Sequence, residues 1–332
     1  MASRWWFIAI VWNNIQSLHK YHLIPRGLRI KTPGKSHMAT PPRGPISTTS
    51  QALVATSFMI LAGAMFAFMH GTVRWLSFDL HPFLIAFFRN LFGFLVLIPL
   101  LIRGGMGRFK TTRMGLHTFR ACVNSISMLT WFTALSLMPL ADATALALTG
   151  PLFVTLGAIL TFAERVRFWR WATLIVGAVG ALMVIRPGFE AANIGALLTI
   201  AATATAAVSK LCAKSLTKTE DPATIAAYVQ FLMTPITFFA ALFYWQWPTI
   251  EQIIGLIVIG TLGSLAHLFT AKAYAIADLS FAEPISFTRM IWATAFGYIV
   301  FSEVPDFWTW AGAFTIVLAT SIISYRERNQ KS

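Results

Sequence analysis

The stretch ALSLMPLADATALALTGPLFVTLGAILTFAERVRFWRWA, residues 134–172, recurs later in the chain. Shifted by 139 residues, it lies without a gap over AYAIADLSFAEPISFTRMIWATAFGYIVFSEVPDFWTWA, residues 273–311. Glu164 falls on Glu303, and the Phe-Trp-x-Trp motif after Glu164 falls on the same motif after Glu303. A shift of 140 residues aligns earlier pairs: Pro82 with Pro222, Ile85 with Ile225 and Arg74 with Lys214. The chain therefore contains two copies of one unit.

The composition is that of a membrane protein. Of 332 residues, 57% are hydrophobic and only 11% are charged. A helix that spans a bilayer needs roughly 20 apolar residues, and runs of that length follow one another after residue 51. Ten spans are predicted: 52–74, 82–103, 115–136, 142–162, 168–186, 193–215, 222–244, 251–275, 280–301 and 308–325. The runs show no polar–apolar alternation, so helices rather than barrel strands are expected.

Five spans in each copy force the second copy to enter the membrane upside down, because five is odd. This is the plan of secondary transporters, whose site lies near the midplane between the halves. We therefore expect an all-α membrane protein with ten transmembrane helices, arranged as two inverted five-helix repeats around a central cavity. The expected parts are a basic, disordered cytoplasmic tail (1–50), the first repeat (51–187), the second repeat (188–326) and a basic cytoplasmic tail (327–332).

The net charge of +14 raises the question of nucleic-acid binding, which the positions of the basic residues answer. If both termini are cytoplasmic, 22 of the 26 Lys and Arg residues fall on the cytoplasmic side. This asymmetry predicts N-in and C-in topology in the cytoplasmic (inner) membrane, and no nucleic-acid partner. The apolar patch at 5–12 is too short to span a bilayer, and a translation start at Met38 would leave residues 1–37 outside the mature protein.

At this point the sequence resembles a known family. Residues 162–185 and 301–323 are similar to the two EamA domains of the drug/metabolite transporter superfamily, and the resemblance covers about residues 52–326. It implies a basket of helices around a cavity, the fifth and tenth spans as outer supports, and a permease for a small polar or amphiphilic metabolite. Within the family the chain looks most like permeases for S-adenosylmethionine or riboflavin uptake. Export of amino acids and lipid flipping on the same scaffold are the alternatives.

Charged residues inside predicted spans are the first candidates for a substrate site. A charge at the centre of a membrane helix costs about 2.5–3.5 kcal/mol even on the insertion scale, so it usually has a role. Arg289 lies about 13 Å into its span at 1.5 Å per residue, and Arg89 is the other deep cation. We expect both to bind an anionic group of the substrate, or to be neutralised by a carboxylate such as Glu283. Bracing of helices through backbone carbonyls is the alternative, and Ser286 lies between Glu283 and Arg289.

Polar residues at helical spacing predict which other faces turn inward. Asn124, Trp131, His267 and Tyr274 are the deepest of them and could offer hydrogen bonds and an aromatic surface to a ring or an onium group. The full stripes are Arg120, Asn124, Ser127 and Trp131; Thr199, Thr203, Lys210 and Lys214; and Ser264, His267 and Tyr274. The alternative is that such residues only join helices to one another.

His70 and His267 suggest coupling to protons, because imidazole titrates near neutral pH. For His70, close to the outer end of its span, a place at the membrane interface is the favoured interpretation. A proton or an exchange substrate is thus the candidate driving partner. The oligomeric state stays open.

Other classes of protein are disfavoured. The sequence has no HExxH motif, no GxSxG motif with partners and no phosphate-binding loop, so no enzyme is expected. Its two cysteines, Cys122 and Cys212, both lie in predicted spans, which argues against a disulfide framework or a metal site. No cofactor is expected. Glu164 and Glu303 are interpreted as structural residues at helix ends, and the paired tryptophans as anchors at the membrane interface.

Overall fold

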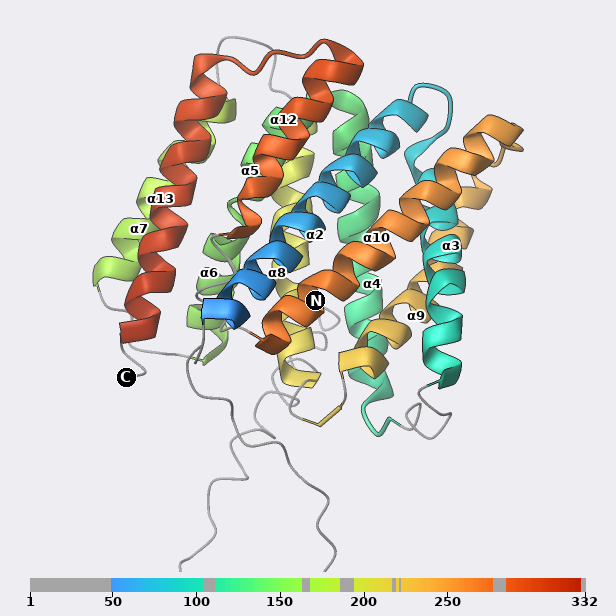
Figure 1. The fold of residues 1–332 in the computed structure, drawn as a ribbon, viewed down its shortest axis with the longest axis horizontal. Helices are drawn as coiled ribbons and strands as arrows, with labels where there is room; N and C mark the ends of the chain where they lie inside the picture. Colours follow the sequence, from blue (N-terminus) through green and yellow to red (C-terminus); the bar gives the residue numbers. More distant parts are fainter. Residues whose placement is uncertain are drawn as a thin grey trace, which may run out of the picture. The chain divides into compact units, whose positions relative to one another are not determined.

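The computed structural model describes residues 49–103, 111–162, 168–185, 194–216, 219–220, 222–276 and 285–329 (Figure 1). Within these ranges all regular elements are helices. The first copy of the repeat supplies α2 (Thr49–Leu76), α3 (Pro82–Arg103), α4 (Met114–Leu137), α5 (Leu140–Ala147), α6 (Gly150–Phe162) and α7 (Phe168–Ile185). The second supplies α8 (Ile194–Leu216), α9 (Pro222–Leu242), α10 (Ile250–Ile276), α12 (Thr288–Phe301) and α13 (Phe307–Asn329). The all-α prediction is confirmed for the described ranges; the tail predicted at 1–50 lies almost wholly outside them.

The helices have the length and composition of membrane spans. Four described segments are long and apolar enough to cross a bilayer: Gln51–Leu76, Leu140–Gly157, Ile194–Ala213 and Ile250–Thr270. Four further helices carry shorter apolar stretches. On α7, Ile175, Val179 and Leu182 follow one another at helical spacing and are 61%, 49% and 52% exposed. An exposed apolar stripe of this kind suits contact with lipid rather than water.

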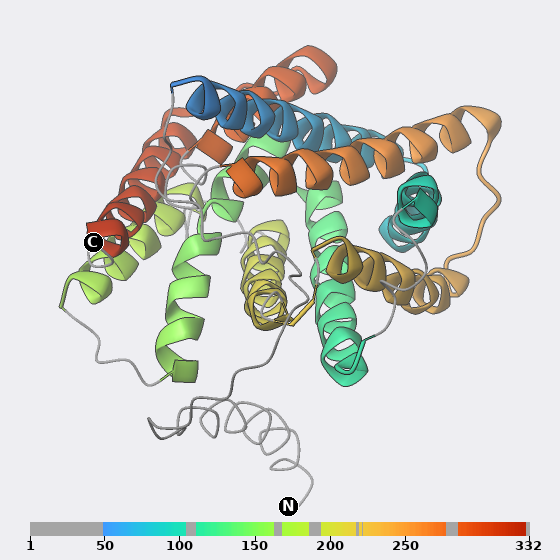
Figure 2. The ribbon, with the colours of Figure 1, turned by 60° about the horizontal axis from the view of Figure 1, so that its bottom comes forward.

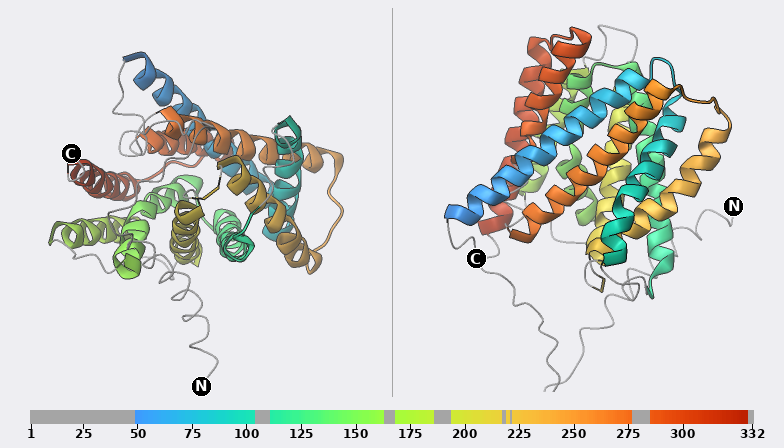
Figure 3. Two further views of the ribbon diagram at one scale, coloured as in Figure 1. Left: turned by 90° about the horizontal axis from the view of Figure 1, so that it is seen from below. Right: turned by 45° about the vertical axis from the view of Figure 1, so that its right-hand side comes forward.

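The contacts between helices have the same symmetry as the internal repeat. Figures 1 and 2 show α2 beside α10 and α7 beside α13. In addition, α4 packs against α8, and α3 against α9. Since α2, α3, α4 and α7 correspond in sequence to α8, α9, α10 and α13, exchanging the two copies turns this set of contacts into itself. Figure 3 shows the α2–α10 pair running along one side of the helices.

Glycines allow α7 and α13, and also α3 and α10, to approach until their backbones touch. A Cβ atom added to Gly180 of α7 would lie 2.9 Å from the carbonyl oxygen of Gly312 in α13. On α10, a Cβ atom at Gly260 would lie 2.9 Å from the amide nitrogen of Gly93 in α3. One turn after Gly260, Ser264 donates a hydrogen bond of 3.0 Å to the carbonyl of Gly93. Small residues of this kind are typical of helix contacts in membranes.

The predicted span at 142–162 is not one continuous helix. It divides into α5 and α6, and between them the amides of Leu148 and Thr149 donate to carbonyls only three residues back. Pro151 explains the division, because it lacks an amide hydrogen and is tolerated only in the first turn of a helix. In the repeat, Gly150, where α6 begins, corresponds to Arg289, the second residue of α12. The two copies therefore start a helix within one residue of the same repeat position.

Candidate functional site

Arg89 of α3 is buried between the two copies of the repeat. Its side chain is 3% exposed, and its Nη1 donates to Oδ1 of Asn90 at 3.0 Å and to Oε1 of Gln230 at 3.1 Å. Asn90 and Gln230 are matched residues of the repeat, 140 positions apart, on the paired helices α3 and α9. Both partners are neutral amides, so these bonds orient the guanidinium without neutralising its charge. Its Nε is buried and bonds to nothing in the described part of the chain.

A row of rings passes beside Arg89. A Cβ atom at Gly263 of α10 would lie 2.9 Å from Nη2 of Arg89, and His267 follows one turn later. The rings of His267, Phe66, His70 and Trp131 form what we call the aromatic row. His267 meets Phe66 edge-on with centroids 5.1 Å apart, Phe66 stacks on His70 at 6.2 Å, and His70 meets Trp131 edge-on at 5.3 Å. The row joins α10, α2 and α4.

Arg289 approaches the same place from α12. It is the second residue of that helix and is half-buried. Its Cα atom would lie 3.6 Å from a Cβ atom at Gly63, which shares one face of α2 with Phe66 and His70. Arg89, Arg289 and His267 all interact electrostatically with His70. We call these four residues, His70, Arg89, His267 and Arg289, the central basic cluster.

The structure thus brings together Arg89, Arg289, His267 and Trp131, which the sequence proposed separately. His70 belongs with them as well, and it is 8% exposed. Arg120 of α4 and Lys210 of α8 add further positive charge, because both interact with His267. Six helices therefore contribute basic groups to one region.

Carboxylates lie elsewhere among the described residues. Glu303 pairs with Arg74, Glu220 pairs with His117, and Asp142 and Asp306 both accept from the Thr309 hydroxyl. Asp79 and Glu251 are exposed, near the ends of helices. Within the described ranges, therefore, Arg89 bonds to neutral amides, and Glu303 and Glu220 pair with basic residues outside the central basic cluster.

The remaining candidates from the sequence fall into two groups. Asn124 donates to Sδ of Met233 at 3.0 Å, and Ser127 on the same face donates to the Ala202 carbonyl at 2.7 Å, so these two join α4 to α9 and α8. Ser286 is half-buried just before α12. Glu283 and the side chain of Tyr274 lie outside the described residues, so the pairing of Glu283 with an arginine stays a prediction.

Two participants were missed at the sequence level. Gln230 sits in the apolar run YVQFL, and its repeat partner Asn90 follows Arg89 directly. A polar pair at matched repeat positions was the available signal. No such signal in the sequence marks Phe66, because its role depends on ring contacts with histidines on two helices.

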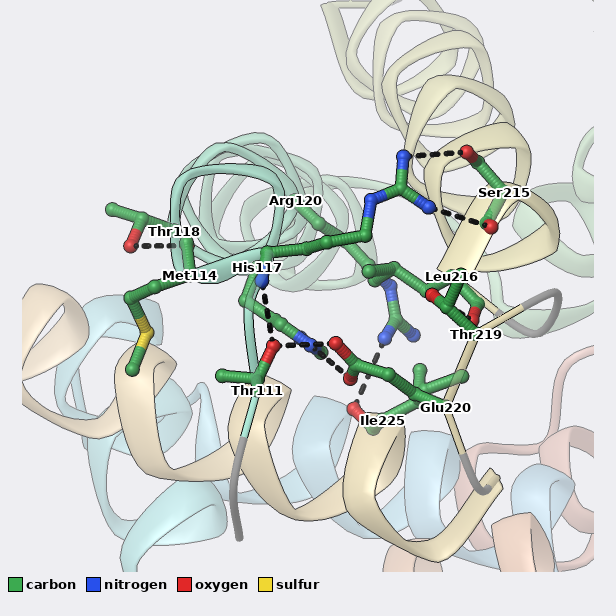
Figure 4. Close-up of polar contacts among 11 residues, drawn as sticks. Thr111, Met114, His117, Thr118, Arg120, Ser215, Leu216, Thr219, Glu220 and Ile225 are labelled. Atoms are coloured by element: carbon green, nitrogen blue, oxygen red, sulfur yellow. Dashed lines mark hydrogen bonds and ion pairs between the residues drawn. The ribbon is translucent and has the colours of Figure 1, made fainter. Parts of the chain in front are cut away.

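A polar network ties the start of α4 to the second copy (Figure 4). We call it the His117 network; its members are Thr111, Arg113, His117, Ser215 and Glu220. His117 Nε2 lies 2.5 Å from Glu220 Oε2, and Thr111 also donates to Glu220. Arg113 donates to the Ser215 carbonyl at 3.0 Å and to its hydroxyl at 3.2 Å. Arg120, one turn on, donates to the Ile225 carbonyl at 3.1 Å.

A second network ties the end of α2 to the residues that follow α12. Arg74 pairs with Glu303 and also donates to the carbonyls of Leu135 and Met138. The other carboxylate oxygen of Glu303 accepts from the Leu140 amide at 3.1 Å. Both charged side chains are mostly buried, 15% and 16% exposed. We call these five residues the Arg74 network.

The distance between the two networks can be estimated along helix α4, which contributes residues to both. His117 and Leu135 are 18 residues apart on it, which at 1.5 Å per residue is about 27 Å. The hydrocarbon core of a bilayer is about 30 Å thick. The networks therefore lie at opposite ends of the helices, with Trp131 and its neighbours in the central basic cluster between them.

Comparison with known proteins agrees with this architecture. The sequence matches the EamA-like transporter family twice, over residues 53–186 and 193–325. It is 31% identical to a riboflavin transporter of Vibrio cholerae, over 86% of this chain and 99% of the relative. A riboflavin transporter of Brucella anthropi is 33% identical over 79% of this chain and 95% of its own, and an S-adenosylmethionine uptake transporter of Rickettsia bellii is 29% identical over 78% and 89%. The chain is a membrane transporter rather than an enzyme, and it belongs to the EamA-like transporter family.

Proposed function

We propose that this protein is a secondary transporter that takes up a small heteroaromatic metabolite of the riboflavin class across the cytoplasmic membrane. The observation that carries the proposal is the central basic cluster with its aromatic row, which lies between two polar networks at opposite ends of the helices. The cluster offers hydrogen-bond donors and ring surfaces, the two features that a polar heteroaromatic molecule needs. The resemblance to riboflavin transporters over nearly the whole of the relative supports the same substrate class.

The two halves, on this proposal, cross the membrane in opposite orientations. Five spans per copy require it, and the exchange symmetry of the helix pairs supports it: α2 with α10 corresponds to α8 with α4. The helices α6 and α12, which start within one residue of the same repeat position, resemble the half-helices that line transporter sites. His267 and Lys210 are exposed although both face charged groups of other helices, which supports a hydrated space between the halves.

The two networks support alternating access. Each joins residues of different halves: Arg74 with Glu303 at one end, and His117 with Glu220 at the other. Rocking one half against the other would separate the partners at one end while keeping them at the opposite end. The central basic cluster would then open to one side of the membrane at a time.

Orientation is proposed as N-in and C-in. In Figure 1 the beginning of α2 and the end of α13 lie at the same end of the helices, as an even number of spans requires. The distribution of Lys and Arg residues supports a cytoplasmic place for that end. The His117 network then closes the cytoplasmic side, and the Arg74 network closes the outer side.

Flavin uptake into proteoliposomes tests the function. Purified protein should give saturable uptake of labelled riboflavin, competed by unlabelled flavins. A proton gradient tests the coupling proposed for His70 and His267. Uptake no faster than in empty liposomes, for riboflavin and for its 5′-phosphate, would refute the flavin assignment. Saturable movement of amino acids would then support the exporter alternative, and movement of labelled lipid between leaflets the flippase.

A further inference from the structure

We infer that Ser302 positions Glu303 in the Arg74 network, which closes the outer side, and that its strained backbone sets how readily this side opens. Ser302 directs the Glu303 carboxylate onto Arg74 in the closed state, and the strain is relieved when the pair separates. The inference rests on the proposed alternating access and does not depend on which substrate is carried.

The backbone of Ser302 is the first observation. Ser302 directly follows α12 and has a left-handed conformation, with φ 55° and ψ 29°. It is the only residue other than glycine with a positive φ in the described part of the chain. A side chain in this conformation brings Cβ close to the following carbonyl oxygen, so glycine is the usual residue at such a helix end. Ser302 is exposed, and its side chain forms no hydrogen bond with the described residues that could offset the strain.

The left-handed turn brings Glu303 back against α12. The Glu303 amide donates to the Gly297 carbonyl at 3.1 Å, and a Cβ atom on Gly297 would lie 3.3 Å from Glu303 Oε2. A right-handed helix continued through Ser302 would instead place Glu303 about 120° around the axis from Gly297, because six residues turn through about 600°. The conformation of Ser302 therefore decides which side of α12 carries the carboxylate.

Arg74 contacts the residues on both sides of Ser302. Its Cζ atom lies 5.3 Å from the ring centroid of Phe301, and its guanidinium pairs with Glu303 Oε1. Glu303 Oε2 accepts from the Leu140 amide, the first of α5, at 3.1 Å. The contacts that join α12 to α2 and α5 at the outer side therefore depend on one strained residue.

The strain acts on the balance between the closed and open states. A strained backbone persists only where surrounding contacts hold it. In the closed state, the contacts of Glu303 with Arg74 and Leu140 hold Ser302 in the left-handed conformation. When these contacts separate, the backbone of Ser302 is free to relax, so the strain weakens the closed state relative to the open one. Glycine at this position would bear no such strain, and the closed state would become more populated.

The experiment measures the closed and open populations in the purified full-length protein without substrate. One spin label is attached at Asp79→Cys, beyond α2, and a second at Val304→Cys, beyond α12; both positions are exposed. Cys122 and Cys212 are replaced by serine, so that only these two positions react. Electron paramagnetic resonance then reports short distances for the closed state and long distances for the open state.

Ser302→Gly should raise the ratio of short to long distances at least about fivefold, the lower end of the usual penalty for a side chain in this conformation. Ser302→Val should lower the ratio, because a β-branched side chain fits the left-handed conformation poorly. Ser302→Asn is the control for size, since asparagine adopts this conformation more readily, and it should not lower the ratio. Arg74→Met, which removes the ion pair, should shift the protein towards long distances. A purely structural role of Ser302 would change the Tm of its variants and leave the ratio unchanged.

Three outcomes separate the possibilities. A higher ratio in Ser302→Gly, with no loss in Ser302→Asn, supports the inference even if Ser302→Val does not fold. An unchanged or lower ratio in Ser302→Gly, while Arg74→Met still shifts towards long distances, overturns the inference and leaves alternating access standing. One distance shared by the wild type, Ser302→Gly and Arg74→Met overturns the inference together with the alternating access on which it rests.

Discussion

Glu303→Gln tests whether the Arg74 network holds the two halves together. The carboxylate has two partners in the structure, since one oxygen pairs with Arg74 and the other accepts from the Leu140 amide at 3.1 Å. The substituted amide has one acceptor oxygen, so it can serve only one of them. Its NH₂ group would then face a second donor, either the Arg74 guanidinium or the Leu140 amide, and could form no hydrogen bond with it.

The expected loss of stability follows from the burial of the Arg74–Glu303 pair. Breaking a buried ion pair by removing one partner costs about 3–5 kcal/mol. Arg74 keeps the carbonyls of Leu135 and Met138, so we take the lower value, about 3 kcal/mol. At roughly 2 °C per kcal/mol for a chain of this length, the Tm should fall by about 6 °C.

A double-mutant cycle in detergent isolates the pair. Glu303→Gln, Arg74→Met and the combined variant are compared with the wild type by thermal unfolding. The combined variant should be less destabilised than the sum of the single ones by about 3 kcal/mol, because it leaves no charge unpaired. Glu251→Gln, which changes an exposed glutamate in the first turn of α10, should cost at most about 1 kcal/mol. Additive effects, or a Tm for Glu303→Gln within 1 °C of the wild type, would refute the reasoning.

Three further predictions follow from other parts of the molecule. Arg289→Ala should abolish flavin uptake while the protein still inserts in the membrane; near-normal uptake would remove Arg289 from the site. Gly180→Ala should destabilise the protein by about 1–3 kcal/mol in thermal unfolding, because its Cβ atom would meet the backbone of α13, whereas Gly115→Ala, with open space around it, should not. Burial lowers the pKa of His81, which stacks on Tyr244, below 6.5. The neutral ring is therefore favoured in the folded protein, its contribution is complete above pH 6.5, and acidification should lower the Tm less in His81→Gln than in the wild type.

The sequence predicted the all-α architecture and the duplicated unit because both depend on local properties: apolar runs long enough to span a bilayer, and a repeat of residue types. It also selected Arg89, Arg289, His267 and Trp131, because charged and aromatic side chains deep in a membrane span are costly or unusual. Their convergence could not be predicted. It depends on the contact of α2 with α10 and of α3 with α9, between residues far apart in the chain.

The two networks show the same limit of prediction from sequence. Arg74 and Glu303 were separate end-of-helix residues in the sequence, and only their contact, across 229 residues, makes them a link between the halves. His70 was interpreted as an interface residue from its place near the end of a span. Its ring contacts with Phe66 and Trp131 place it in the interior instead.

The opposite orientation of the two halves is tested most directly at matched loop positions. Asp79 and Thr219 are 140 residues apart, both exposed, in the corresponding connections after α2 and α8. Single cysteines are placed at each in a background in which Cys122 and Cys212 are replaced by serine, and intact cells are treated with a membrane-impermeant maleimide. The account predicts labelling of Asp79→Cys from outside, and labelling of Thr219→Cys only after the membrane is permeabilised. Labelling of both from the same side would contradict it.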